Sequence, residues 1–272
     1  MKSQRAPSLK PDDDAADSLE VPAAVVCARC GRPECLGCDT IDETTIPSGI
    51  VAIVPWERPG LSAWSRLWAT ARIVTRSAPQ FCSAVPSGDL PAALLFATLC
   101  EFGAIGSMGL TLALAGLAIA PHFALAFLAQ EVWRTLLLRV LLVSLPGFSF
   151  IMVAAHVALG LGINHAGGKL GGKFRRNHAL RFGLYSAGWD LMTSPLGFVV
   201  VLFTEGPRAA IALIPMAFDV AGRGSAAFAR GVLQLDESRA LKARTVGAAL
   251  SLAFTCCAVA VLLAVIGILI AI

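Results

Sequence analysis

The chain changes from a mixed polar pattern to a strongly apolar one near residue 89. From there five apolar stretches follow one another, each close to or above the ~20 residues that a helix needs to cross ~30 Å of hydrocarbon. Backbone groups in such a layer must be hydrogen-bonded within the segment, so each stretch predicts an α-helix. The predicted spans are residues 90–120, 140–163, 182–204, 209–235 and 246–272.

Polar or helix-breaking residues interrupt four of the five predicted spans. Glu101 lies in the first, Pro146 breaks the second, and Asp190 and Pro195 lie in the third. The fourth is the least regular. Its interrupting residues are Pro215, Asp219, Arg223 and Arg230.

Ionisable groups at membrane depth are costly, so they indicate either a polar path through the bundle or an internal pair. Glu101, His156 and Asp190 are the groups that a path would use. In the alternative, His156 hydrogen-bonds a neighbouring helix and Asp190 lies near the cytoplasmic interface. Asp219 has Arg223 one turn later as a local partner.

An amphipathic helix is predicted in the region 62–88, before the first span. Its apolar residues recur at helical spacing, while its arginines fall on other faces. The apolar set is Trp64, Leu67, Trp68, Ala71 and Val74, and the basic set is Arg66, Arg72 and Arg76. Such a helix either lies in the membrane interface or packs on the protein's own membrane domain.

Three segments precede that helix. Residues 1–20 are rich in Pro, Asp and Lys and predict a disordered tail. Residues 21–45 are rich in cysteine, and residues 46–61 form a linker in which Pro55 and Pro59 oppose a helix.

Composition agrees with a polytopic all-α membrane bundle of about five helices: 56% of residues are hydrophobic and 15% are charged, and the mean hydropathy is +0.72. The N-terminus lacks the pattern of a secretory signal peptide, so we expect it in the cytoplasm. Lys and Arg gather in the loop around Arg175 and in the stretch before the last span, which predicts those regions inside and the C-terminus outside. The net charge of +4 gives no indication of nucleic acid as a partner.

Four cysteines lie within "CARCGRPECLGC", namely Cys27, Cys30, Cys35 and Cys38. Two pairs of the form Cys-x-x-Cys supply four thiolates, the complete set for a structural zinc ion with no open position. The spacing from Cys30 to Cys38 also matches part of a plant-type iron–sulfur pattern, but there the fourth cysteine lies downstream instead of upstream. Zinc is therefore the predicted cofactor, with an iron–sulfur cluster and no metal as the alternatives.

The glycine-rich stretch after the second predicted span does not indicate a nucleotide-binding site. "GGKLGGKF" approaches a phosphate-binding loop, but Phe174 stands where Ser or Thr is required and an apolar span precedes it instead of a strand. We interpret it as a flexible basic turn.

The remaining cysteines, Cys82, Cys100, Cys256 and Cys257, lie in apolar surroundings and are expected to be buried. Small residues form one stripe at 154, 158 and 162 and another at 247, 251 and 255, where helices approach closely.

The order of features resembles the Yip family, five-span membrane proteins named for interacting with Ypt/Rab GTPases. Four stretches carry the resemblance: "LWATARIVTRSAPQFCSAVPSGDLPAALLFATL", "HAGGKLGGKFRRNHALRFGLYSA", "TSPLGFVVVLF" and "LDESRALKART". It covers residues 56–272, with the five-span domain at 89–272. The four-cysteine segment is an addition to that family's shared domain.

The resemblance implies a bacterial-type member of the family in the inner (cell) membrane. Its implied function is that of a non-enzymatic scaffold or membrane organiser, acting through contacts with lipid and with other proteins. It is expected to form homo- or hetero-oligomers. No motif indicates an enzyme or a small-molecule substrate. The alternative function is a small transporter or channel that uses Glu101, His156 and Asp190.

Overall fold

The computed structural model of the protein describes residues 25–26, 51–52, 54–58, 60, 62–83, 85 and 88–271. The chain divides into two compact units, residues 1–53 and 54–272. In the first unit, strands β1 (Val25–Val26) and β2 (Val51–Ala52) pair antiparallel, with Val26 opposite Val51. The predicted tail and the four-cysteine segment lie outside the described residues.

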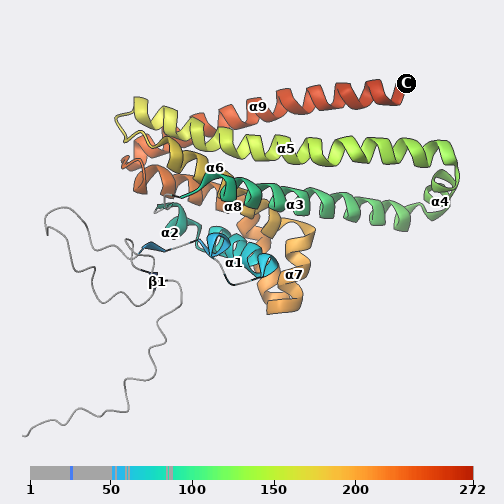
Figure 1. Ribbon diagram of the computed structural model, residues 1–272, viewed down its shortest axis with the longest axis horizontal. Coiled ribbons are helices and arrows are strands. Elements are labelled where there is room, and N and C mark those ends of the chain that lie inside the picture. The colour runs from blue at the N-terminus through green and yellow to red at the C-terminus, as the bar shows by residue number, and fades with distance from the viewer. Residues whose placement is uncertain are drawn as a thin grey trace, which may run out of the picture. The chain divides into compact units, whose positions relative to one another are not determined.

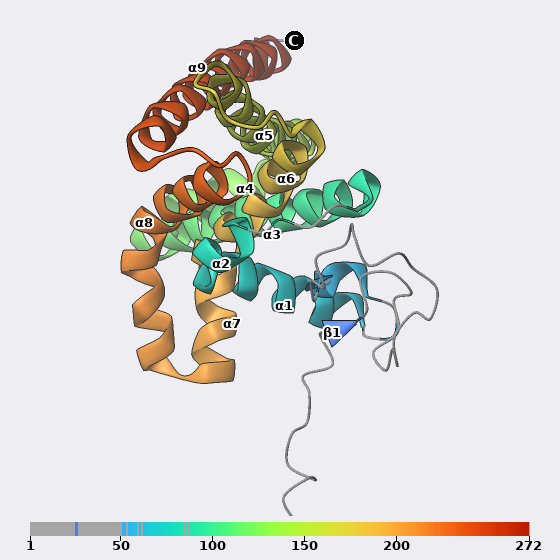
Figure 2. The same ribbon diagram turned by 90° about the vertical axis from the view of Figure 1, so that its left-hand side faces the viewer.

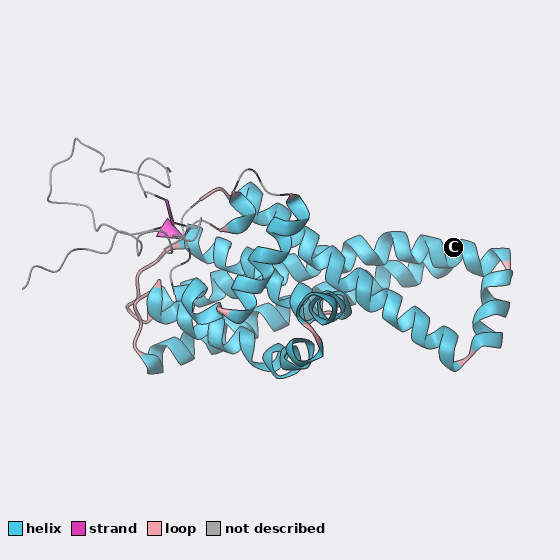
Figure 3. Cartoon of the chain, turned by 90° about the horizontal axis from the view of Figure 1, so that it is seen from below, coloured by secondary structure: helices cyan, strands magenta, loops and turns pink. Residues whose placement is uncertain are grey.

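The second unit is built of helices joined by short loops (Figure 3). It begins with the 3₁₀ helix η2 (Pro55–Glu57), followed by α1 (Ala63–Arg76) and α2 (Ala78–Ser83). The longer elements are α3 (Leu90–Ile119), α4 (Pro121–Ala129), α5 (Glu131–Lys169), α6 (Arg176–Thr193), α7 (Pro195–Glu205), α8 (Pro207–Gly231) and α9 (Glu237–Ala271).

The helices α3, α5 and α9 lie lengthwise beside one another, and the short α4 joins α3 to α5 at the far tip (Figure 1). Large apolar side chains such as Leu112, Leu142 and Val261 are exposed along them. In a soluble protein such a surface would be unstable, whereas lipid accommodates it. Four helices, α3, α5, α8 and α9, are long and apolar enough to cross a membrane, which indicates an integral membrane protein.

The third predicted span is not one straight helix. α6 and α7 are bent by 69° at Ser194, between Thr193 and Pro195. Pro195 has no N–H to continue the helical ladder. The Ser194 side chain accepts a hydrogen bond from Gly197 N at 3.3 Å and so caps α7 as a new helix. By itself this pair is a broken span or a re-entrant segment, so the count is four spans or five.

The other boundaries also differ from the predictions. The second predicted span is part of a helix of 39 residues, and Pro146 lies inside it without breaking it. The fourth, expected to be the least regular, is the continuous α8 with Pro215 inside it. The expected flexible turn begins later than predicted, because Gly167, Gly168 and Lys169 complete α5.

The predicted amphipathic helix is α1. Ser62 caps it, accepting a hydrogen bond from Ser65 N at 3.2 Å. Its apolar face, including Leu67, Trp68 and Val74, is buried, and the indole nitrogen of Trp189 on α6 donates to Val74 O at 3.0 Å. That face therefore packs on the protein's own bundle. A position in the membrane interface stays a prediction; Trp64, which is 58% exposed, lies on the outer face.

Candidate functional site

Three ionisable side chains from three helices meet inside the bundle. His156 of α5 has its Nε2 atom 2.9 Å from Asp190 Oδ2 of α6 and 3.2 Å from Glu101 Oε1 of α3. One ligand-type atom from each residue lies within 4.8 Å of the other two. These are the three groups that the sequence indicated for a polar path, and the helix-to-helix hydrogen bond expected of His156 is confirmed.

The close approach of α5 and α6 brings His156 to Asp190. A Cβ atom added at Gly183 would lie 2.5 Å from His156 O, and one added at Gly160 would lie 2.2 Å from Ala179 O. Real Cβ atoms do not come so close to a backbone oxygen, so this contact needs glycine at both positions. The two glycines let the backbones touch and place the imidazole against the carboxylate.

Ser186 determines which imidazole nitrogen carries a hydrogen. Its hydroxyl donates to Gly183 O at 2.6 Å, which uses its single hydrogen. His156 Nδ1 lies 2.9 Å from the same hydroxyl oxygen. Nδ1 must therefore be the donor in that contact, and Nε2 is the nitrogen that faces the two carboxylates.

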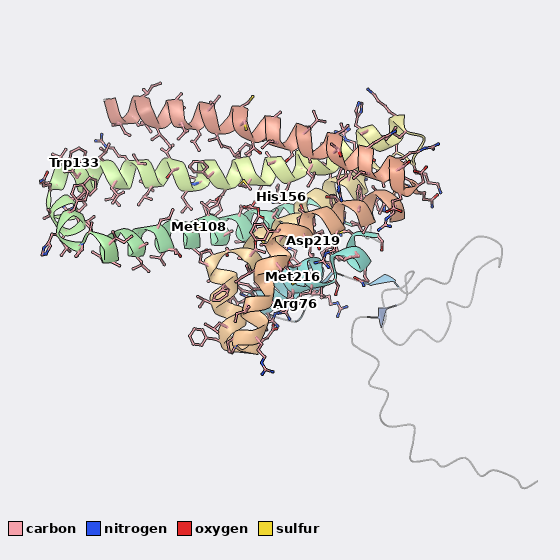
Figure 4. The ribbon with its side chains drawn as sticks, turned by 180° about the vertical axis from the view of Figure 1, so that it is seen from behind. Arg76, Met108, Trp133, His156, Met216 and Asp219 are labelled. Carbon is pink, nitrogen blue, oxygen red and sulfur yellow. The ribbon has the colours of Figure 1, made fainter. Side chains whose placement is uncertain are left out.

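The cluster lies deep along its helices. At 1.5 Å per residue, Glu101, His156 and Asp190 lie roughly 16–21 Å from the ends of α3, α5 and α6 nearest the basic loop. A ~30 Å hydrocarbon layer needs only ~20 residues, and α3 and α5 are longer than that, with 30 and 39 residues, so the cluster lies inside the bundle and away from the helix ends. Figure 4 labels His156 within the bundle, with Trp133 at the far tip.

Two cavities adjoin the cluster. The first, of about 750 Å³, lies among α3, α5 and the end of α6, and Glu101 lines it. The second, of about 470 Å³, lies among α5, α6, α8 and α9, and His156 lines it. Met152, Asp190 and Thr193 line both. The cluster therefore forms part of the wall between the two cavities.

The remaining residues of interest lie elsewhere. Asp219 pairs with Arg223 at 2.7 Å on α8, as the spacing predicted, and Figure 4 labels Asp219. The metal site predicted at Cys27, Cys30, Cys35 and Cys38 lies outside the described residues, so it stays a prediction.

The four other cysteines divide into two pairs. Cys82 and Cys100 are buried, as expected, and burial raises the pKa of the Cys82 thiol, so the thiol stays protonated. The expectation was wrong for Cys256 and Cys257, which are exposed on α9. Apolar side chains near them on α9, such as Leu252 and Val261, are exposed as well, as on a helix face that meets lipid.

Sequence reasoning missed Ser186, Gly160 and Gly183. A signal was present in the spacing: Ser186 precedes Asp190 by one turn, and Gly183 precedes it by two turns, so the three share a face of α6. Gly160 likewise follows His156 by one turn on α5. Extending a search from each ionisable residue to its own helical face would have found all three.

Comparison with models of protein families, with curated proteins and with solved structures gives no match for this chain. The resemblance to the Yip family therefore stays a prediction.

Proposed function

We propose that the protein is a membrane transporter or channel that passes a cation through the Glu101–His156–Asp190 cluster. The observation that carries the proposal is the meeting of three ionisable side chains, from three helices, in the wall between two cavities. Groups of this kind are expensive at membrane depth and usually mark an ion pathway.

The broken helix beside the cluster supports the same function. The break at Ser194 follows Asp190 by one turn, and Ser194 itself lines the first cavity. In transporters, discontinuous helices near the middle of the membrane commonly form the binding site, because backbone freed from the helix lines a cavity. α6 and α7 form a discontinuous helix of this kind, and Figure 2 shows α7 running downward, away from α6.

The scaffold function implied by the Yip resemblance makes no use of the cluster. It needs exposed apolar helices and partners, and it predicts that neutralising Asp190 leaves the function intact. The two proposals therefore differ in a single measurement.

That measurement is cation flux in liposomes containing the purified full-length protein. We expect movement of protons or of Mn²⁺, reported by enclosed dyes. Asp190→Asn should reduce the rate roughly tenfold or more, since losing one charge in a low-dielectric site is worth at least the ~1.4 kcal/mol that corresponds to tenfold. Asp219→Asn, an equal charge change on the exposed part of α8, should leave the rate unchanged. No flux of any tested cation, or equal rates for the two variants, would refute transport through this site.

A further inference from the structure

We infer that the cluster is a binding site for a divalent first-row transition-metal ion, with Glu101 Oε1, His156 Nε2 and Asp190 Oδ2 as its protein ligands. The inference deepens the proposed function and rests on it for the role of the ion as cargo. It is a second metal site, separate from the one that the four N-terminal cysteines predict.

The spacing of the three atoms fits one shared metal ion. Imidazole nitrogen and carboxylate oxygen bind such ions at ~2.0–2.2 Å, so two ligands at right angles are about 3.0 Å apart. His156 Nε2 lies 2.9 Å from the Asp190 oxygen and 3.2 Å from the Glu101 oxygen. Small rearrangements of the side chains would place all three around one ion.

The orientation of the imidazole points its free nitrogen at that position. Because Nδ1 donates to Ser186 Oγ, the hydrogen bond from Nε2 to Asp190 requires a proton on both ring nitrogens. When Nε2 loses its proton, its lone pair is directed at two carboxylate oxygens. A lone pair and two negative charges repel one another unless a cation lies between them. A divalent ion balances the two carboxylates and uses the lone pair.

Glu101 supplies an independent observation. It is only 1% exposed, and its Oε1 atom is buried without a hydrogen bond of good geometry in the described part of the chain. Burying a carboxylate oxygen without such a hydrogen bond raises the free energy of the folded protein. This oxygen is directed at the other two ligands. Binding a metal ion would remove that cost.

The charges around the site favour a cation on one side. The charged residues among those lining the first cavity are Glu101 and Asp190, both acidic. The second cavity adds Arg244 of α9, whose Nη1 atom donates to Gly222 O at 3.2 Å. A positive charge there disfavours a cation in the second cavity relative to the first, so entry from the first cavity is expected.

The donor set decides the class of ion. Mg²⁺ and Ca²⁺ prefer oxygen ligands, whereas an imidazole nitrogen with two carboxylates suits Mn²⁺, Fe²⁺, Co²⁺ or Zn²⁺. Three protein ligands leave open coordination positions, which an ion must have if it is to enter and leave. Four thiolates, in contrast, would enclose zinc completely.

The test is Co²⁺ titration of the full-length protein in detergent, with Cys27, Cys30, Cys35 and Cys38 changed to Ser so that only the bundle site remains. We expect one equivalent of Co²⁺ to bind, with the weak visible absorption of nitrogen and oxygen ligands. Mn²⁺ should compete, and millimolar Mg²⁺ should not.

Variants distinguish ligation from folding. Glu101→Gln and Asp190→Asn keep the shape of each side chain and should weaken Co²⁺ binding, whereas His165→Gln, exposed nine residues later on α5, should not. Ser186→Ala leaves the ligands in place but frees the imidazole, so it should weaken binding by about 10–100-fold while the visible spectrum keeps its form. Circular dichroism confirms that each variant is folded.

The outcomes separate this inference from the proposed function. Folded protein that binds no Co²⁺, or binds it equally after Glu101→Gln, overturns the metal site, and proton flux in liposomes would then still support transport. Co²⁺ binding that Glu101→Gln weakens supports the metal site. If no cation crosses the membrane in that case, the site stands as a resident metal site and transport is refuted.

Discussion

Arg181 is a fully buried charged side chain on α6. Its Nη2 atom lies 2.7 Å from Glu57 of η2, and its Nη1 atom donates to Asp89 O at 3.0 Å. The Tyr185 hydroxyl donates to the same Glu57 carboxylate. One guanidinium thus connects the start of the second unit and the beginning of α3 to α6.

Removing only one partner of this buried pair should be costly. We expect Arg181→Ala to lower the free energy of unfolding by about 3–5 kcal/mol, because Glu57 loses its charged partner. The double variant Arg181→Met with Glu57→Gln should lose less, since no unpaired charge remains. Unfolding followed by circular dichroism in detergent measures both, and a double variant as unstable as Arg181→Ala would contradict the explanation.

Glycine contacts set the spacing of the central helices. On the α5–α9 side, a Cβ atom added at Gly247 would lie 2.5 Å from Ile163 Cγ1, and one at Gly162 would lie 2.9 Å from Gly247 Cα. Ser251 Oγ also donates to Ala155 O at 2.8 Å. The two small-residue stripes seen in the sequence therefore contact each other, as close helix packing requires.

The α5–α6 contact gives an element-scale prediction. Gly183→Ala should separate the two helices, lower stability by about 1–3 kcal/mol through overpacking, and weaken Co²⁺ binding by moving His156 away from Asp190. Gly116→Ala on α3 is the matched control, because an added Cβ there meets nothing within 4 Å. It should change stability by less than about 1 kcal/mol. Equal effects of the two changes on Co²⁺ affinity would contradict the role given to Gly183.

At the scale of the whole molecule, the number of crossings depends on the α6–α7 pair. α3, α5, α8 and α9 each satisfy the requirements of a span alone, while α6 and α7 satisfy them only together. Lys173 N, just after α5, donates to Leu233 O, just after α8, at 2.9 Å, so these two loops lie on the same side of the membrane. The bent pair and α8 therefore either both cross or both fail to cross, and in each case the two ends of the chain lie on opposite sides. The third and fourth crossings thus depend on each other.

A reporter fusion decides between these topologies. We expect an enzyme that is active only in the cytoplasm to be silent when attached after Ile272, and to be active when inserted near Lys173, in the basic loop that should remain inside. An active C-terminal fusion would contradict this topology. Insertion of the same reporter at Gly206, between α7 and α8, decides between the two arrangements, since it should be silent if the pair crosses and active if the pair re-enters.

The sequence by itself determined the features that depend on neighbouring residues. A long apolar stretch predicts a helix whatever its tertiary contacts are, because each helix satisfies its own backbone hydrogen bonds. α3 matches its predicted span to within one residue at its end, and the pair of Asp219 with Arg223 needs only helical spacing. Pro195 was visible as an interruption, but the bend of 69° was not.

Only the tertiary structure decided how these helices combine. The sequence named Glu101, His156 and Asp190 together as the groups that a polar path would use, yet it contained no information about the distances between them. Their meeting depends on the contact of Gly160 and Gly183, where two helices approach because neither has a side chain in the way. Such packing is a property of two surfaces at once. No local pattern along one chain segment contains it, which is why the site became visible only when the helices were placed together.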